Sequence, residues 1–437
     1  MGAAGPAAAR RRDAAIRLSA RAALLVLAAL AGCDRASDGA TVVQLWAMGR
    51  EGEMVERLVP EFERDNPSIH VRVQQLPWSA AHEKLLTAFV GDAMPDVFQA
   101  GNTWLPEFVA LEALEPLDEW IGRPGGVDAA DDFPGILATN VVDGTTWGVP
   151  WYVDTRVLFY RADLLAAAGH PQAPRTWDEW RAAMEAVKAR GDGGYPILLP
   201  LREWQPLVIL GLQAGSDLLR DGGRFGDFRG APFRRAFEFY VGLFRDGLAP
   251  GTGEASVANL YQDFASGFLA MTVTGPWNLG EFARRLPAAV AGLWATAPMP
   301  APDGDAPGTS LAGGASLALF RGSPRKEEAW RLVEYLSAPA QQARFYELTG
   351  DLPARRSAWR AASLDREPRT RAFWTQLGAV RPTPPVPEWE RIATLVTQHA
   401  EAAVRGLATT DAALAALDAD VDQALAKRRW ILDEAPR

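Results

Sequence analysis

From residue 41 onward, short apolar runs alternate with amphipathic segments, and this alternation constrains the fold more than any other feature. Residues 41–46, 69–73 and 96–100 have the character of strands. Between them, apolar side chains recur at the three- and four-residue spacing of a helix. Strands that alternate with helices form βαβ units and a mostly parallel sheet. The pattern therefore predicts an α/β fold whose ligands bind at the carboxyl ends of the strands.

The alternation continues through the second half of the chain. Thr176 and Glu179 form a capping box, which predicts a helix that extends to about residue 190. Ser323 is the expected cap of another helix. A chain of 437 residues is too long for one core, so roughly two to three domains are expected. The other expected strands and helices cover residues 270–273, 315–320, 324–336, 388–405 and 410–429.

The N-terminus has the pattern of a targeting segment. Three arginines at 10–12 precede an apolar run over residues 22–32. The run is shorter than the roughly 20 apolar residues of a membrane span, and a basic region followed by a short apolar region is typical of a secretory signal peptide. We expect residues 1–32 to be a signal peptide and residues 33–40 to be a tether.

The end of this segment, Leu30-Ala31-Gly32-Cys33, resembles the lipobox of bacterial lipoproteins. The resemblance implies that Cys33 is lipidated and anchors the chain to a membrane. Asp34 resembles a signal for retention at the inner membrane. The expected location is the periplasm, anchored to the inner membrane, or the outer face of the cell membrane in a Gram-positive organism. The alternative is a plain signal peptide in which Cys33 is incidental.

Composition excludes several classes of function. The formal net charge is −9, and an acidic chain is a poor partner for nucleic acid. A single Cys allows no intrachain disulfide and no Cys-based zinc site. The four His are scattered, and no nucleotide-binding or nucleophile motif is present. We expect no metal, no cofactor and no catalytic residue, although missing motifs are weak evidence against an enzyme, because a glycosidase needs only two carboxylates.

Several segments resemble the family 1 extracellular solute-binding proteins of carbohydrate ABC transporters. Residues 89–98, 104–108 and 114–117 are similar to the first lobe of that family. Residues 148–160 resemble its crossover between lobes, and residues 176–180 the helix that follows. The remaining similar segments cover residues 270–277, 313–314 and 349–354.

The resemblance implies a fold of two α/β lobes with doubly wound sheets, joined by a hinge, with the ligand cleft between them. Lobe 1 would comprise residues 41–150 and 308–357, and lobe 2 residues 155–305 and 358–430. Lobes of this kind close on a ligand by hinge motion.

The implied function is that of an extracytoplasmic sugar-binding subunit of an ABC importer. It would bind a mono- or disaccharide, with a maltose- or trehalose-like sugar as the best candidate. It would deliver that sugar, as a monomer, to permease subunits served by a cytoplasmic ATPase. Two alternatives remain open. One is an extracytoplasmic glycosidase with a Trp-lined cleft and a pair of carboxylates, and the other is a sugar-sensing lipoprotein of the same fold.

A sugar has apolar C–H faces and a rim of hydroxyls, so its site needs aromatic platforms and fixed polar groups. Trp277 follows Gly275-Pro276 at a strand end and matches a stacking position of the family. Packing in the core is the alternative for each aromatic candidate, and we assign Trp104 to packing. The other aromatic candidates are Trp204, Trp389 and Trp46.

Asp154 is the strongest polar candidate because it lies at the crossover, where a carboxylate can accept from two adjacent hydroxyls. The alternative for Asp154 is a surface ion pair with Arg156. Glu51 could equally be a solvated residue at a helix start, and the paired glycines a simple turn. The other candidates are Asn102, Thr103, Glu51, Gly313, Gly314 and Arg355.

Overall fold

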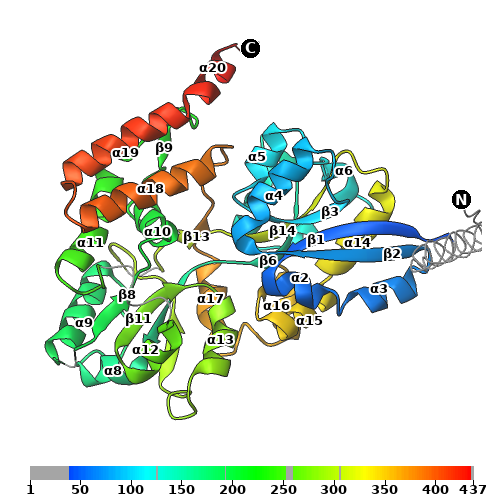
Figure 1. Ribbon diagram of the computed structural model, residues 1–437. Coiled ribbons are helices and arrows are strands. Elements are labelled where there is room, and N and C mark those ends of the chain that lie inside the picture. The colour runs from blue at the N-terminus through cyan, green and yellow to red at the C-terminus, as the bar shows by residue number, and fades with distance from the viewer. Residues whose placement is uncertain (1–38, 125, 192, 252–258, 305–306, 435–437) are drawn as a thin grey trace, which may run out of the picture.

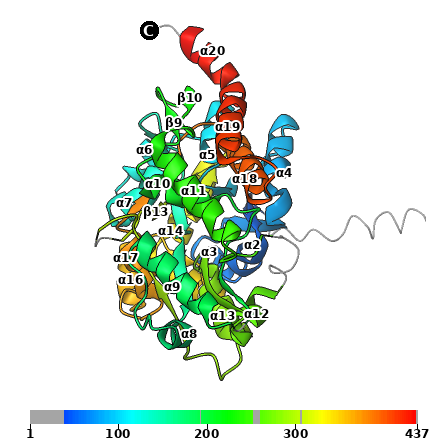
Figure 2. The ribbon, with the colours of Figure 1, turned by 90° about the vertical axis from the view of Figure 1, so that its left-hand side faces the viewer.

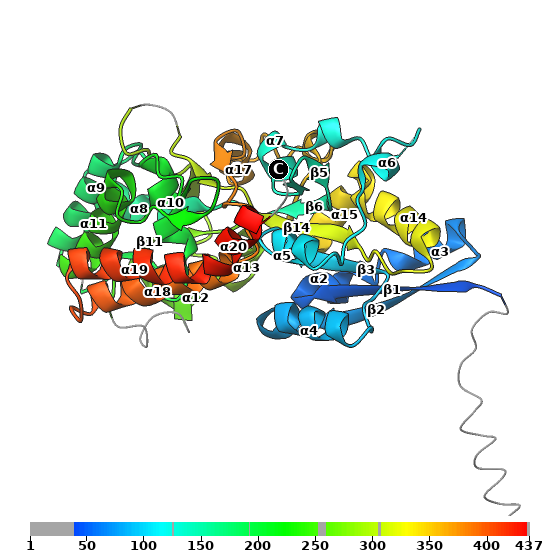
Figure 3. The ribbon, with the colours of Figure 1, turned by 90° about the horizontal axis from the view of Figure 1, so that it is seen from above.

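The computed structural model describes residues 39–124, 126–191, 193–251, 259–304 and 307–434. The expected signal peptide and the proposed lipidation site Cys33 lie outside the described residues. Within them, two α/β lobes lie side by side (Figures 1 and 3). No helix in this part of the chain is both long enough and apolar enough to cross a membrane.

The first lobe, called lobe 1 below, is organised by a six-stranded sheet with the order β15-β6-β14-β3-β1-β2. Strand β1 runs parallel to both β2 and β3. Strand β14 runs antiparallel to β3 and β6, so the sheet is mixed and not mostly parallel as expected. Its strands are β1 (Thr41–Met48), β2 (Ile69–Leu76), β3 (Val97–Gly101), β6 (Val149–Val153), β14 (Gly314–Leu319) and β15 (Leu352–Pro353).

Helices cover both faces of this sheet. Successive side chains of a strand point to opposite faces. Leu45 and Ala47 accordingly belong to one buried cluster and Trp46 and Met48 to another. The helices of lobe 1 are α2 (Gly49–Val55), α3 (Val59–Asp65), α4 (Trp78–Val90), α5 (Leu105–Ala110), α6 (Asp118–Ile121), α7 (Pro134–Ala138), α14 (Lys326–Ser337), α15 (Pro339–Thr349) and α16 (Arg356–Ala361).

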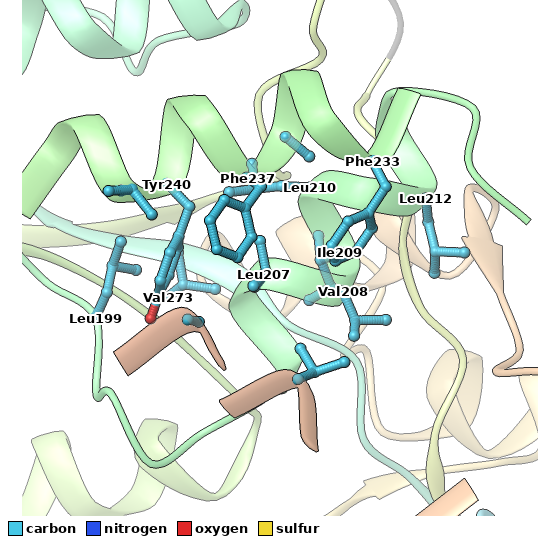
Figure 4. Close-up of a cluster of buried hydrophobic side chains, with 14 of the residues drawn as sticks. Leu199, Leu207, Val208, Ile209, Leu210, Leu212, Phe233, Phe237, Tyr240 and Val273 are labelled. Carbon is cyan, nitrogen blue, oxygen red and sulfur yellow. The ribbon is translucent and has the colours of Figure 1, made fainter. Parts of the chain in front are cut away.

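The second lobe, lobe 2, contains a four-stranded sheet with the order β12-β7-β11-β8. Its largest buried cluster includes the interface where α10 (Gln205–Gln213) packs on α11 (Ala231–Arg245), to which Leu207, Phe233, Phe237 and Tyr240 contribute (Figure 4). The strands are β7 (Val157–Arg161), β8 (Tyr195–Leu198), β11 (Leu269–Thr274) and β12 (Trp294–Ala297).

The remaining helices of lobe 2 follow the expected pattern closely. The Thr176 hydroxyl accepts a hydrogen bond from the Glu179 amide, which confirms the predicted capping box. The predicted helix 410–429 is instead two helices that break at Leu425, and the second extends beyond the rest of the fold (Figure 2). These helices are α8 (Ala162–Ala167), α9 (Trp177–Ala189), α12 (Leu260–Ser266), α13 (Trp277–Arg285), α17 (Thr370–Gln376), α18 (Trp389–Val404), α19 (Thr410–Ala424) and α20 (Ala426–Glu434).

Two crossings between the lobes are tied to one another. After β6 the chain enters lobe 2 through residues 154–156, and it returns through β13 (Ser310–Leu311). The Asp154 amide donates to the Gly313 carbonyl at 2.9 Å. The Ser310 hydroxyl accepts from the Arg156 amide at 3.2 Å and donates to the Arg156 carbonyl at 2.8 Å. The crossings therefore form one connected element beneath the cleft.

Candidate functional site

A cavity of about 550 Å³ lies between the lobes and is lined by both of them. This volume falls within the range of small-molecule sites, about 300–1,000 Å³. Four Trp side chains and five carboxyl groups reach it, but among its lining residues Arg50 is the only cationic one. Its aromatic and carboxyl residues are Trp78, Trp104, Tyr152, Trp204, Trp277, Glu51, Asp154, Glu281, Asp351 and Glu390.

The aromatic residues come from both lobes. In lobe 1, Trp78 at the start of α4 stands edge to face with Trp104, with ring centroids 5.9 Å apart. In lobe 2, Trp204 stands edge to face with Trp389 at 5.3 Å. Trp78 is 41% exposed, which is unusual for a side chain of this size. The cavity thus offers flat apolar surfaces on each side.

Trp277 begins α13, and its ring position depends on two neighbours. The Arg156 guanidinium carbon lies 4.4 Å from the ring centroid, within cation–π range. On another side, a Cβ added at Gly275 would lie 1.9 Å from the ring, so only glycine fits there. Backbone and guanidinium together hold the indole in place.

A buried chain of hydrogen bonds leads to Glu51. The Met48 amide donates to the Gln99 Oε1 at 2.7 Å, and the Gln99 Nε2 donates to the Tyr152 hydroxyl at 2.8 Å. That hydroxyl in turn donates to the Glu51 Oε1 at 3.1 Å. The indole N–H of Trp78 approaches the other carboxylate oxygen at 3.4 Å. Glu51 is therefore surrounded by donors although it is nearly buried.

Asp154 lies at the first crossing beside Arg156. Their closest N–O distance is 3.6 Å, and Arg156 lies 3.8 Å from Glu203. Both distances are too long for hydrogen bonds, and Asp154 Oδ1 and Arg156 Nη1 are buried without a hydrogen-bond partner. Burial raises the pKa of Asp154, an effect that Arg156 opposes. The pair lies at the cleft, with Arg156 buried and Asp154 half-buried, and is not the surface ion pair of the alternative.

Asp351 and Glu390 are two further carboxyl groups of the cavity. Burial raises the pKa of Asp351 to about 8, and the neighbouring charges of Glu51 and Asp154 add to the effect. Burial also raises the pKa of Glu390, which begins α18. The Thr103 hydroxyl donates to Glu390 at 2.5 Å across the cleft. Several carboxyls of this site therefore hold protons more strongly than exposed ones do.

Most of the predicted site residues come together around this cavity. Asn102 is already engaged, because its amide donates to Thr139 at 2.5 Å and its oxygen accepts from Ser316 at 3.0 Å. Gly314 has a φ of +141° and its Cβ position would overlap the Tyr152 carbonyl, which requires glycine. The predicted residues that line the cavity are Trp277, Asp154, Trp204, Asn102, Thr103, Glu51, Gly313 and Gly314.

Three predicted residues lie elsewhere, so we withdraw them as cavity-lining residues. Trp46 packs beneath α4, with the Lys84 ammonium over its ring. Trp389 is fully buried in lobe 2 and supports Trp204 from behind. The Arg355 guanidinium points into lobe 1, where it donates to the Ser337 carbonyl at 3.1 Å and approaches Asp132. Position near a strand end or motif did not reveal which way these side chains point.

Six aromatic and carboxyl residues of the cavity were not predicted from the sequence. Trp104 was assigned to packing, although its indole also lines the cavity. Tyr152 and Asp351 lie within segments that carried the family resemblance, which was the signal that could have found them. Trp78 and Glu390 lie at helix starts with no motif to mark them. The missed aromatic and carboxyl residues are Trp78, Trp104, Tyr152, Glu281, Asp351 and Glu390.

Comparisons with known proteins agree with this two-lobed architecture. The family model described as bacterial extracellular solute-binding protein matches residues 49–343, well over half of the chain. The sugar-binding protein MalE from Xanthomonas citri superimposes with a TM-score of 0.86. It is 50% identical to this chain, and the match covers 91% of this chain and 100% of MalE.

Two curated relatives extend the comparison. The diacetylchitobiose-binding protein DasA of Streptomyces coelicolor is 24% identical, with 90% of this chain and 94% of DasA covered. The galactooligosaccharide-binding protein of Bacillus subtilis is 25% identical, with 85% of this chain and 86% of the relative covered. The named ligands of these relatives differ in their sugar units.

Proposed function

Since the chain belongs to the family of bacterial extracellular solute-binding proteins, we propose that it is the extracytoplasmic sugar-binding subunit of an ABC importer. It captures a mono- or disaccharide, with a maltose- or trehalose-like sugar as the first candidate, and delivers it to the permease. It acts by binding alone and carries out no covalent chemistry. The similar proteins are described as binders of sugars or oligosaccharides, which supports this class of ligand.

One observation carries the proposal: the cavity combines four indoles with five carboxyl groups between two lobes. Indole faces pack against the apolar face of a pyranose ring, and carboxyl oxygens exchange hydrogen bonds with its hydroxyls. Because the residues come from both lobes, a bound sugar contacts both at once. Binding therefore favours the closed conformation, and it does so by the difference between the free energies with which the closed and the open forms bind the sugar.

The proposed cellular setting follows from the N-terminal segment. Residues 1–32 direct export, Cys33 carries the lipid anchor, and the protein works as a monomer at the outer face of the inner membrane, or of the cell membrane in a Gram-positive organism. Its partners are the permease subunits with their cytoplasmic ATPase. Mass spectrometry of the membrane fraction tests the anchor, since a Cys33→Ala variant should lack the lipid mass and leave the membrane.

Isothermal titration of the purified protein against mono- and disaccharides tests the ligand class. We expect saturable one-to-one binding of at least one sugar. Binding of peptides or polyamines, with no heat from any sugar, would refute the carbohydrate assignment. Uptake of the tightest-binding sugar by cells with and without the gene then tests delivery. Unchanged uptake in the deletion strain would favour a sensory role.

A further inference from the structure

The hydrogen bonds that lead to Glu51 can run in only one direction. The Met48 amide is a backbone N–H and can only donate, so the Gln99 side chain must present its oxygen to it. The Gln99 amide nitrogen then faces the Tyr152 oxygen and donates to it. With its lone pair engaged, the Tyr152 hydroxyl has its proton free for Glu51. A fixed backbone donor therefore determines the orientation of every group in the chain.

Glu51 is the last residue of this chain and must accept the hydrogen bond from Tyr152. The Glu51 Oε1 takes the proton of Tyr152, and the indole N–H of Trp78 points at the Oε2. A carboxylate that receives donors on both oxygens is stabilised in its ionised form. Gln99 is completely buried, so water cannot replace it in the chain. Glu51 is thus held as an acceptor by Tyr152 and Trp78, which line the cavity, and through Tyr152 by Gln99, which does not.

Asp351 lines the cavity from lobe 1, as Glu51 does, but it receives fewer hydrogen bonds than Glu51. It is 7% exposed, and Thr349 supplies its one local hydrogen-bond contact. The charged groups that face it are Glu51, Asp154 and Arg50. Burial raises the pKa of Asp351 to about 8, and the two anions add to this effect while Arg50 opposes it. Burial also raises the pKa of Glu51, but the hydrogen bonds from Tyr152 and Trp78 oppose that effect, so of the two carboxyls Asp351 holds a proton more strongly.

We propose that Gln99 acts through Tyr152 to fix Glu51 as a hydrogen-bond acceptor, and that Asp351 is a hydrogen-bond donor toward the same bound sugar. Gln99 is a positioning residue, because it does not line the cavity. The two carboxyls then distinguish a hydroxyl that donates from one that accepts, which sets the orientation of the sugar. This inference rests on the proposed function, since it presupposes a hydroxylated ligand in the cleft.

Isosteric amides test the division of roles. Glu51→Gln places an NH2 toward the ligand, because Tyr152 must still donate to the new amide oxygen, and affinity should fall by about 100-fold. Asp351→Asn keeps a donor in place, so the loss at pH 7 should be less than about tenfold. Equal losses in the two variants, or a larger loss for Asp351→Asn, would overturn the assignment of donor and acceptor.

The pH profile of binding supplies an independent readout. Wild-type affinity should be constant from pH 6 to 7.5 and fall above the pKa of about 8 as Asp351 loses its proton. Asp351→Asn should remove this fall. Asp132→Asn is a matched control, because Asp132 is also a buried carboxyl in lobe 1 with a raised pKa but lies outside the cavity. A fall above pH 8 that persists in Asp351→Asn would contradict the proposal.

The chain of hydrogen bonds from Met48 to Glu51 is tested by reversing the direction in which its groups donate. In the double variant Gln99→Glu with Glu51→Gln, the new carboxylate at 99 accepts from Met48 and Tyr152. The amide at 51 then donates to Tyr152 and turns its oxygen to the sugar. Affinity should recover by about tenfold over Glu51→Gln alone. A folded double variant, judged by its thermal transition, that binds no better than Glu51→Gln would overturn the role of Gln99.

These outcomes separate the inference from the proposed function. If the wild-type protein binds no sugar, the proposed function fails. If it binds sugar but both isosteric variants behave alike, the proposed function stands and the assignment of Glu51 and Asp351 is wrong. If the double variant does not fold, the comparison of Glu51→Gln with Asp351→Asn still decides the assignment.

Discussion

The Thr103 hydroxyl of lobe 1 donates a hydrogen bond to the Glu390 carboxyl of lobe 2, at 2.5 Å across the cleft. Thr103 follows β3, and Glu390 begins α18, so the contact joins segments 287 residues apart. It holds the two lobes together directly, without a ligand between them.

Thr103→Ala should open the ligand-free protein. The variant loses the contact between lobes and leaves the buried Glu390 carboxyl without its donor, so we expect a larger radius of gyration by X-ray scattering. Sugar affinity should fall by about three- to tenfold, because binding must then also close the lobes. Thr87→Ala is the control, since the Thr87 hydroxyl bonds only within its own helix. Identical scattering from Thr103→Ala and wild type would contradict this role.

Trp277→Ala and Asp154→Ala should each weaken sugar binding by about 2–4 kcal/mol, because each removes a side chain that lines the cavity. Titration calorimetry measures the loss. Trp430→Ala removes an indole that is 63% exposed and outside the cavity, and it should bind like wild type. If Trp277→Ala and Asp154→Ala also bind like wild type, the sugar does not occupy this cavity.

Arg156→Met should weaken binding through Trp277, because the guanidinium that lies over its ring is lost. In a Trp277→Ala background the same substitution should have a smaller effect, with a coupling energy of about 1 kcal/mol. Arg123 lies 3.9 Å from the Trp120 ring, away from the cavity, so Arg123→Met is a matched control without effect on affinity. Strictly additive losses would show that Arg156 does not act through Trp277.

Asp132 should make the stability of the protein depend on pH. It is buried without a hydrogen-bond donor, and its pKa is raised to about 7. The unfolded chain releases this proton near pH 4, so between about pH 4 and 7 only the folded state holds it. Stability should therefore fall as pH rises through this window, by up to a few kcal/mol.

Asp132→Asn should remove that part of the slope, as measured by thermal unfolding at pH 4, 5.5, 7 and 8.5. Deprotonation of Asp351 also lowers the stability as pH rises, up to about pH 8. This part of the pH dependence should remain in the Asp132→Asn variant. An unchanged slope between pH 4 and 7 would mean that Asp132 titrates normally.

The regular elements could be predicted from the sequence because local patterns specify them. The alternating strand at 69–73 and the capping box at Thr176 both formed where expected. The sheet direction could not be predicted this way. β14 lies next to β3 although more than 200 residues separate them, and local periodicity carries no information about such pairings.

The site was only partly predictable for a related reason. Trp277 and Asp154 lie in segments that resemble the family, and both line the cavity. Trp46 and Trp389 occupy comparable places in the sequence, but each side chain packs into a hydrophobic cluster and does not face the cavity. In a fold with helices on both faces of a sheet, either side of a strand is apolar. An aromatic residue in the sequence therefore does not indicate which side of its strand or helix faces the cavity.

One buried cluster of hydrophobic side chains includes residues from both sheets. Val153 and Leu352 come from lobe 1, and Phe159 and Phe373 from lobe 2. Part of the apolar surface of each lobe is therefore buried only by the other lobe, and the two halves should not fold as stable separate fragments. Heating should melt both lobes in a single cooperative transition. The two lobes can therefore move relative to each other about the hinge and still unfold as one cooperative unit.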